Sequence, residues 1–347
     1  MDRYIGLDAH ATSCTIAVVG PTGRKLGSHV VETNGQALVE QVRAIARPRH
    51  LCLEEGTQSA WLYEVLSPHV DELVVAGVAP SRGPKSDALD AMGLAQALRT
   101  GAIETSVFKA PTRFTMLREL ARTYHMLTGD VVRAQCRIKA LYRSRGIATP
   151  GLTVYGMPHR DEWVAKLPAG CRPSALLHHA EFDRLRELKE QASKQLVDES
   201  HRHPISRVLE TCPGMGPIRV AMTIPVIVAP SRFRTSRQLW SYSGLGIVMR
   251  SSSDWVLSAT GWKWANVAQT RGLNPRFNHT LKYVFKGAAT TVITKLADCP
   301  LRGDYSRLLE AGTKPNLAKL TLARKIAATL LAMWKHEEEY DPARHRK

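Results

Sequence analysis

The chain has 347 residues, of which 44% are apolar, and this size predicts two or three folded domains. Its 48 Lys and Arg residues outnumber 31 Asp and Glu residues, so the formal net charge is +17 and the pI is about 9.9. This excess favours a polyanionic partner, nucleic acid, over a merely basic surface. The sequence has no apolar signal segment and no run near the roughly 18 apolar residues of a membrane span, so we expect a cytoplasmic protein without a membrane partner.

The six cysteines lie far apart, with no CxxC pair and no zinc-ligand spacing. We therefore expect reduced, mostly buried thiols. His178, His179, His201 and His203 stand in charged, polar stretches. We expect them to be solvated helix residues and not metal ligands.

Residues 3–32 alternate as three strands do, in YIGLD, TIAVV and KLGSHVVE, and predict a meander. Helices are expected at 35–47 and 59–69, and short apolar strands at 50–54 and 72–78. A meander followed by strands that alternate with helices predicts a mixed α/β sheet covered on both faces. This order is similar to that of a ribonuclease-H-like fold, and we assign it to a domain at 1–110.

A helical arm is expected at 111–203. Its first helix, at about 112–145 and with a break near Gly129 left open, carries basic residues outside its apolar side: Arg118, Arg122, Arg133, Arg137, Lys139, Arg143 and Arg145. Only Glu119 and Asp130 stand beside them, so we interpret this helix as a phosphate-contacting surface, with a solvated face as the alternative. The Gly- and Pro-rich residues 146–173 are expected to connect it to a second charged helix at 174–201.

The last domain, 204–347, is expected to be mostly helical. Residues 208–221 predict a helix, a glycine turn and another helix, in which Gly214 and Gly216 would let backbone N–H groups approach a DNA phosphate. A turn between two packed helices is the structural alternative. A final helix at 317–334 has an apolar side and is expected to close the core.

Four carboxylates are expected to meet in the first domain. Asp8 lies on the first strand and Glu54 at the end of a later one, while Asp87 and Asp90 share one helix face. In a ribonuclease-H-like sheet these elements converge, and a hard divalent cation removes the repulsion between the carboxylates. We predict a site for Mg²⁺, with Mn²⁺ as an alternative, suited to a phosphodiester substrate. Each residue alone could be structural, with Asp87 a helix cap and Asp8 a turn residue, and Glu55 replaces Glu54 if the register shifts by one.

With YIGLDAH, LCLEEGT, KSDALDAMGLA, PGMGPIRVA, FRTSRQLWSYSGL and GTKPNLAKLTLARKIAATLLAMWK in this order, the chain resembles the DEDD-type transposases of bacterial insertion sequences, the bridge-RNA-guided serine recombinases. The resemblance runs from about residue 3 to 342. It implies a ribonuclease-H-like, resolvase-like N-terminal domain, a long helical arm and a mostly α C-terminal transposase domain. It also assigns the catalytic and metal-binding roles to Asp8, Glu54, Asp87 and Asp90.

The resemblance places a serine nucleophile at Ser252, counted from the Gly-Leu pair before it, with Ser251 and Ser253 as rivals. Ile247 stands where the family usually has Pro, and Ser253 where it has Gly, so the loop departs from the family pattern. Arg250 is a candidate clamp on the phosphate or a surface arginine. The residues by themselves favour a Ser-rich, solvent-exposed turn.

The activity that the resemblance implies is a transposase-recombinase that cuts and rejoins DNA through a covalent 5′-phosphoserine. A structured guide RNA would select donor and target DNA, and the acidic cluster and the serine would meet between subunits of a homodimer or homotetramer. One rival is a junction-resolvase-like nuclease that uses water, in which Ser252→Ala keeps cleavage. The other is a non-catalytic nucleic-acid-binding regulator, in which Asp8→Ala changes nothing.

Overall fold

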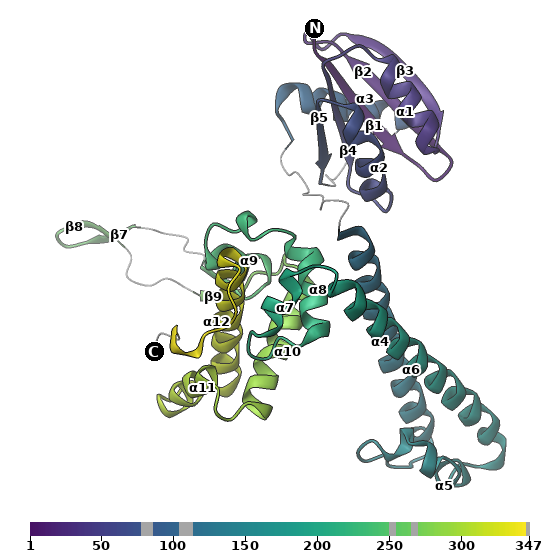
Figure 1. Ribbon diagram of the computed structural model, residues 1–347, viewed down its shortest axis with the longest axis vertical. Helices are drawn as coiled ribbons and strands as arrows, with labels where there is room; N and C mark the ends of the chain where they lie inside the picture. Colours follow the sequence, from purple (N-terminus) through teal and green to yellow (C-terminus); the bar gives the residue numbers. More distant parts are fainter. Residues whose placement is uncertain (78–85, 104–113, 250–254, 265–269, 345–347) are drawn as a thin grey trace. The chain divides into compact units, whose positions relative to one another are not determined.

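The computed structural model describes residues 1–77, 86–103, 114–249, 255–264 and 270–344. The chain divides into two compact units, Met1–Thr112 and Arg113–Lys347, which are described separately below (Figure 1). The first unit contains a five-stranded sheet and the second contains the arm and a group of shorter helices. Among the described residues, no helix has both the length and the apolar character needed to cross a membrane.

The sheet of the first unit has the strand order β3-β2-β1-β4-β5. Its strands are β1 (Arg3–Ala9), β2 (Ser13–Val19), β3 (Lys25–Glu32), β4 (Arg49–Glu54) and β5 (Glu72–Ala76). The first three form the predicted antiparallel meander, and β4 and β5 continue the sheet parallel to β1. This confirms the predicted mixed α/β sheet, and its strand order is compatible with a ribonuclease-H-like fold.

One face of the sheet packs against α1 (Gly35–Ala44) and α2 (Ser59–Leu66), the helices that lead into the two parallel strands. Every second side chain of the central strands points into this core. Its fully buried members include Ile5, Leu7, Ile16, Leu38, Leu51 and Leu66. Asn34 caps the start of α1, where its side-chain oxygen accepts the amide hydrogen of Gln36 at 2.9 Å.

The opposite face of the sheet carries α3 (Asp87–Thr100), which lies very close to β1. A Cβ atom on Gly6 would lie 1.9 Å from the carbonyl oxygen of Ala91 and 2.6 Å from the amide nitrogen of Ala95. Only glycine leaves room for a helix backbone at this distance. Asp8 is two residues further along the strand, so it lies on the same face as Gly6 and belongs to the side of the sheet that α3 covers.

The arm consists of α4 (Thr115–Arg143) and α6 (Arg172–Ser200), close to the predicted bounds, and α4 continues unbroken through Gly129. Figure 1 shows the two helices running side by side. The connection between them is more than the link predicted, because it contains α5 (Arg160–Ala165) and 3₁₀ turns at Thr153–Tyr155, Met157–His159 and Ala169–Cys171. Val154 and Trp163 of this connection pack with Tyr142 and Phe182 in a small core. The burial of these large apolar side chains gives the connection a fixed fold despite its many glycines and prolines.

His179 of α6 corrects one prediction. It was expected in solvent, but it is 1% exposed, and neither ring nitrogen has a hydrogen-bond partner among the described residues. Burial lowers the pKa of its imidazole, and the charge of Arg160 lowers it further. His178 and His203 are half-buried and His201 is exposed. The prediction was wrong for His179 because the folded connection covers a helix face that was expected to be free.

The cysteines are also less buried than predicted. Cys14, Cys52 and Cys212 are buried, whereas Cys171 and Cys299 are half-buried. Cys136, on the outer side of α4, is exposed. All six are free thiols, so the prediction of a reduced set is consistent with the structure, and the prediction of burial holds for three of them.

The rest of the second unit is mostly helical, as predicted. Its helices are α7 (Ile205–Glu210), α8 (Pro217–Ile227), α9 (Ser236–Tyr242), α10 (His279–Lys295), α11 (Pro300–Glu310) and α12 (Pro315–His336). The long α12 packs against α9, α10 and α11 and closes the core through Leu322, Ile326 and Leu330, as expected. Both arm helices pack against α8, which joins the arm to these helices in one compact unit.

Four short strands of this unit were not predicted. They form two antiparallel ribbons, β6 (Ile247–Met249) with β9 (Thr270–Leu273) and β7 (Trp255–Ser258) with β8 (Gly261–Trp264). Strands of three or four residues are too short to show a period-two pattern in the sequence.

Candidate metal centre and nucleic-acid interface

The end of β1 and the start of α3 bring three potential metal ligands together. His10 Nε2 lies 3.3 Å from Asp8 Oδ2 and 3.2 Å from Asp87 Oδ1. One ligand atom from each of the three residues lies within 4.8 Å of the others. Two of the four predicted carboxylates, Asp8 and Asp87, are therefore adjacent, and the donor set of two oxygens and one nitrogen suits a divalent cation.

The structure excludes two of the purely structural roles considered for these carboxylates. Asp8 lies within β1 opposite Thr15 of β2, so it is a strand residue and not a turn residue. The cap of α3 is Ser86, whose Oγ accepts the amide hydrogen of Leu89 at 3.3 Å. Asp87 follows that cap in the first helical turn, where the helix dipole stabilises a negative charge.

The surroundings of the Asp8 carboxyl disfavour its ionised form, and a bound cation would favour it. Burial raises its pKa, and its side chain is 16% exposed. His10 acts against this rise, whereas the charges of Asp87 and Asp90 add to it. Asp90, half-buried in the first turn of α3, therefore acts on Asp8 through its charge. A divalent cation would stabilise the ionised form of every one of these carboxylates.

The strand register distinguishes the two neighbouring glutamates at the end of β4. The leucines that precede Asp8 and Glu54 pair with each other across β1 and β4, and both lie in the core beneath α1 and α2. Because side chains alternate, Asp8 and Glu54 belong to the opposite face, the one that α3 covers. Glu54 is exposed and lies outside the group formed by the two aspartates and the histidine. Glu55 accepts a hydrogen bond from Ser59 Oγ at 3.3 Å, at the start of α2. The register thus favours Glu54 over Glu55 as a companion of Asp8.

His10 is the member of this group that sequence reasoning missed. The signal was available, because His10 follows Asp8 by two positions in YIGLDAH and residues two apart in an extended segment share a face. The side chain of His10 is 51% exposed.

The predicted nucleophile Ser252, its two serine neighbours and Arg250 lie outside the described residues. The strands before and after them, β6 and β7, are described. The β7–β8 ribbon exposes Trp255, Leu257 and Trp262, each by more than half of its surface. Exposed aromatic side chains of this kind are typical of surfaces that bind a partner or stack on bases.

Several basic residues predicted to contact phosphate already have partners within the arm. Arg122 pairs with Glu119 at 3.1 Å, Arg133 pairs with Asp130, Arg137 pairs with Glu181 of α6, and Lys139 Nζ donates to the Gly151 carbonyl at 3.0 Å. Sequence reasoning missed Glu181 because it lies on the other helix. Ion pairs between exposed side chains are worth at most about 1 kcal/mol, so a phosphate can replace the acidic partner. Arg118 is half-buried and Arg143 is exposed.

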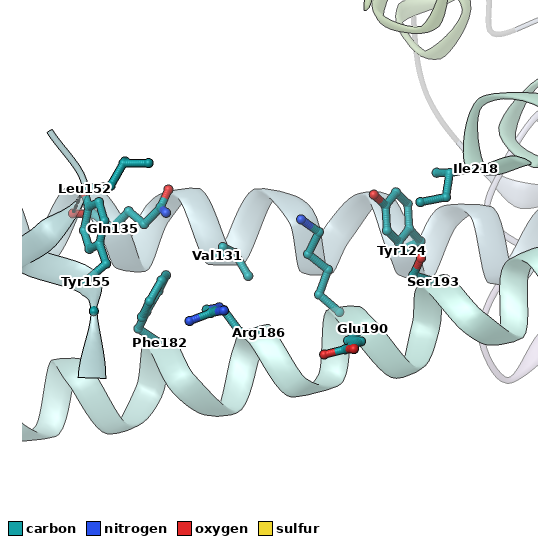
Figure 2. A pocket seen from close by; sticks show the side chains of 12 residues that line it. Tyr124, Val131, Gln135, Leu152, Tyr155, Phe182, Arg186, Glu190, Ser193 and Ile218 are labelled. Atoms are coloured by element: carbon teal, nitrogen blue, oxygen red, sulfur yellow. Dashed lines mark hydrogen bonds between the residues drawn. The ribbon is translucent and has the colours of Figure 1, made fainter. Parts of the chain in front are cut away.

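A groove of about 550 Å³ lies along the arm between α4 and α6. Figure 2 shows Tyr155 and Phe182 at one end of it and Tyr124 towards the other. The rings of Tyr155 and Phe182 are 5.4 Å apart, and the Arg186 guanidinium lies 5.7 Å from the Phe182 ring centre. Lys189 lines the same groove. Tyr155 and Phe182 are buried in the core of the arm, so the groove offers nucleic acid the basic side chains of Arg186 and Lys189 and the half-buried ring of Tyr124. Neither Arg186 nor Lys189 was singled out from the sequence.

The two glycines of the predicted DNA-contacting turn have different surroundings. Gly214 has φ +79°, and a Cβ atom there would lie 2.5 Å from the Ala288 carbonyl oxygen of α10. Its own carbonyl accepts a hydrogen bond from Arg219 at 2.7 Å. Gly214 therefore allows two segments to pack closely, which is the structural alternative. Gly216, at the start of α8, is exposed and has open space around it.

Comparisons with known proteins match two separate segments of the chain to protein families. Residues 5–144 match the model of a transposase family, the DEDD transposases of IS110 elements. Residues 206–294, from α7 to α10, match the model described as the transposase IS116/IS110/IS902 family. Both models describe transposases, and the chain belongs to the IS110/IS116/IS902 family of transposases.

The chain is also similar to a curated protein, the insertion element IS116 uncharacterized 44.8 kDa protein of Streptomyces clavuligerus. The two are 27% identical over 138 residues, which make up 40% of this chain and 31% of that protein. The chain thus spans about a third of the length of this relative.

Proposed function

We propose that this protein moves an insertion element by cutting and rejoining DNA strands, with divalent cations held by Asp8, Glu54, Asp87 and Asp90. The observation that carries the proposal is the meeting of Asp8 and Asp87 at the end of β1, at distances suited to one cation. The register of β4 and the electrostatic influence of Asp90 on Asp8 support the other two residues. Family membership supports the reaction class.

The carboxylates would hold Mg²⁺ or Mn²⁺, which supplies positive charge against the phosphodiester and lowers the pKa of a bound nucleophile. In this proposal two different elements position the carboxylates: a central strand, β1, carries Asp8, and the start of α3 carries Asp87. Gly6 sets the separation of those elements, because it lets the backbone of α3 approach β1. The residues of the chain therefore pre-organise the site before DNA binds.

The nucleophile in this proposal is Ser252, which the resemblance to the family supports. Its Oγ would form a bond to phosphorus while the bond from phosphorus to the 3′-oxygen breaks, and the serine proton passes overall to that oxygen. The product is a 5′-phosphoserine and a free 3′-hydroxyl. The number of phosphodiester bonds stays the same, so a second 3′-hydroxyl can reverse the reaction and join a new strand without ATP.

The basic charge of the chain supports nucleic-acid partners for this reaction, which we propose to be donor DNA, target DNA and a structured guide RNA. The arm would contact the sugar-phosphate backbone and the unpaired bases of the RNA. The groove between α4 and α6 supports this role, because Arg186 and Lys189 line it together with the half-buried ring of Tyr124.

The chemical step is tested with the purified protein, Mg²⁺, end-labelled donor and target DNA, and RNA transcribed from the flanks of its own element. On a denaturing gel, the wild type should form a protein–DNA adduct and Ser252→Ala should not, whereas Ser251→Ala and Ser253→Ala serve as matched controls that keep it. Cleavage without an adduct in all four proteins would instead favour a junction-resolvase-like nuclease that uses water. If Asp8→Ala leaves every product unchanged, the carboxylates have no catalytic role.

The nucleic-acid role of the arm is tested by the salt dependence of RNA binding. Replacing Arg186 or Lys189 by Ala should weaken binding and lower the slope of log affinity against log salt by about 1 for each lost phosphate contact. Arg184→Ala is the matched control, because Arg184 of the same helix pairs with Glu187 at 3.0 Å and does not line the groove. Equal effects of all three changes would refute a specific role of the groove.

A further inference from the structure

His10 is placed to act as a ligand and not only as a neighbour of the carboxylates. Its backbone is held in the turn after β1, where its N–H donates to the Ser13 carbonyl at 3.0 Å and its carbonyl accepts from Thr33 Oγ1 at 2.8 Å. Its ring extends from this fixed backbone to the two aspartates and remains half-exposed. The fold thus sets the backbone position of His10, from which the half-exposed ring reaches both aspartates.

The distances from His10 Nε2 to the two aspartate oxygens are close to those between neighbouring ligands of an octahedral ion. Bonds of about 2.1 Å at right angles place neighbouring ligand atoms about 3.0 Å apart. His10 Nε2 lies 3.3 Å from the Asp8 oxygen and 3.2 Å from the Asp87 oxygen, slightly beyond that value. A small inward movement of the donor atoms around an ion would therefore complete the arrangement.

The chemistry of an imidazole nitrogen distinguishes among metals. Carboxylates and water suit Mg²⁺ and Mn²⁺ alike, whereas Mg²⁺ strongly prefers oxygen donors and imidazole favours transition metals. We propose that His10 Nε2 binds the divalent cation together with Asp8 and Asp87, and that this nitrogen makes the site prefer Mn²⁺ over Mg²⁺. This inference rests on the proposed metal site and adds both a fifth residue and a metal preference to it.

The test is pulsed electron paramagnetic resonance of Mn²⁺ bound to the full-length protein, which detects the nuclear spin of a directly coordinated nitrogen. Wild type is compared with His10→Gln, Asp8→Asn and a matched control, His29→Gln, which changes an exposed histidine of β3 in the same unit. Affinities for Mn²⁺ and Mg²⁺ are measured on the same four proteins by calorimetry. None of these readouts depends on DNA cleavage.

We expect a coordinated-nitrogen signal in wild type and His29→Gln and its loss in His10→Gln. Mn²⁺ affinity of His10→Gln should fall by about tenfold or more, whereas its Mg²⁺ affinity should change much less. Retained Mg²⁺ binding also shows that the carboxylates of this variant are still in place. Mn²⁺ bound by the wild type without nitrogen coordination would overturn the inference and leave the proposed function intact. Equal metal affinity in Asp8→Asn and wild type would overturn both, because no site would then exist at Asp8.

Discussion

Gly6→Ala should damage the candidate metal centre although it changes no ligand. The new Cβ would lie 1.9 Å from the Ala91 carbonyl oxygen, and real Cβ contacts essentially never fall below 3.0 Å. Helix α3 would therefore have to move away from β1 by at least 1.1 Å, the difference of these two distances. The opposing atoms are helix backbone, which cannot rotate aside as a side chain does. We expect a cost of about 3 kcal/mol, at the upper end of the range for overpacked cores.

The matched control is Gly93→Ala, on α3 itself. A Cβ atom at Gly93 would have nothing within 4 Å, so alanine there should stabilise the helix by about 0.5–1 kcal/mol. Hydrogen exchange of the full-length protein, read by mass spectrometry on peptides from β1 and α3, is the appropriate assay. Tryptophan fluorescence is less suitable, since Trp61 is the one tryptophan of the first unit and six others lie in the second.

A loss of 3 kcal/mol corresponds to exchange about a hundredfold faster in α3. Mn²⁺ affinity should fall as well, because Asp87 moves with the helix while Asp8 stays on the strand. Unchanged exchange in α3 of Gly6→Ala, or equal effects of the two glycine variants, would refute the steric argument.

Three further predictions concern other parts of the chain. The pKa of Asp8 is raised in the fold, so ionising this carboxyl costs stability as the pH rises above its unfolded pKa of about 3.9. Asp8→Asn should therefore raise the free energy of unfolding at pH 7 in EDTA, as measured by urea titration. The difference from wild type should vanish near pH 3. Asp304 is 3% exposed and pairs with Lys325 Nζ at 2.6 Å. Asp304→Ala should lower the free energy of unfolding by about 2 kcal/mol, less than for a fully buried pair because the lysine is partly exposed. An unchanged melting temperature would contradict this. Burial raises the pKa of the Cys52 thiol to about 11, whereas Cys136 is exposed. Iodoacetamide at pH 8 should therefore label Cys136 well before Cys52, as measured by peptide mass spectrometry. Similar labelling rates would contradict the burial of Cys52.

Local sequence patterns were sufficient to predict a helix or strand wherever the element was long enough to show its periodicity. The strands of the meander have seven or eight residues and show alternation, and the arm helices have 29 residues each and show helical periodicity. Their bounds were therefore predictable within a few residues. The strands of the two ribbons have only three or four residues, and the folded connection at 146–173 has no repeating pattern, so neither was predictable.

The candidate site shows the same division. The carboxylates Asp8 and Asp87 were identified from residue type and from the order of elements along the chain. His10 was missed although its spacing from Asp8 indicated a shared face. The choice of Glu54 over Glu55 needed the observed pairing of β1 with β4, because a shift of one residue would have exchanged the two faces.

By itself, the sequence determined the order of the longer strands and helices, the excess of positive charge and the presence of an acidic set on the first strand and a following helix. These features depend on residue type and on spacing within one element, which are local properties. Only the tertiary structure decided that Gly6 admits α3, that Asp87 of α3 meets Asp8 and His10, and that Glu181 pairs with Arg137 across the arm. Each of these depends on packing distances between elements that are far apart in the chain, and such distances leave no periodic trace in the sequence.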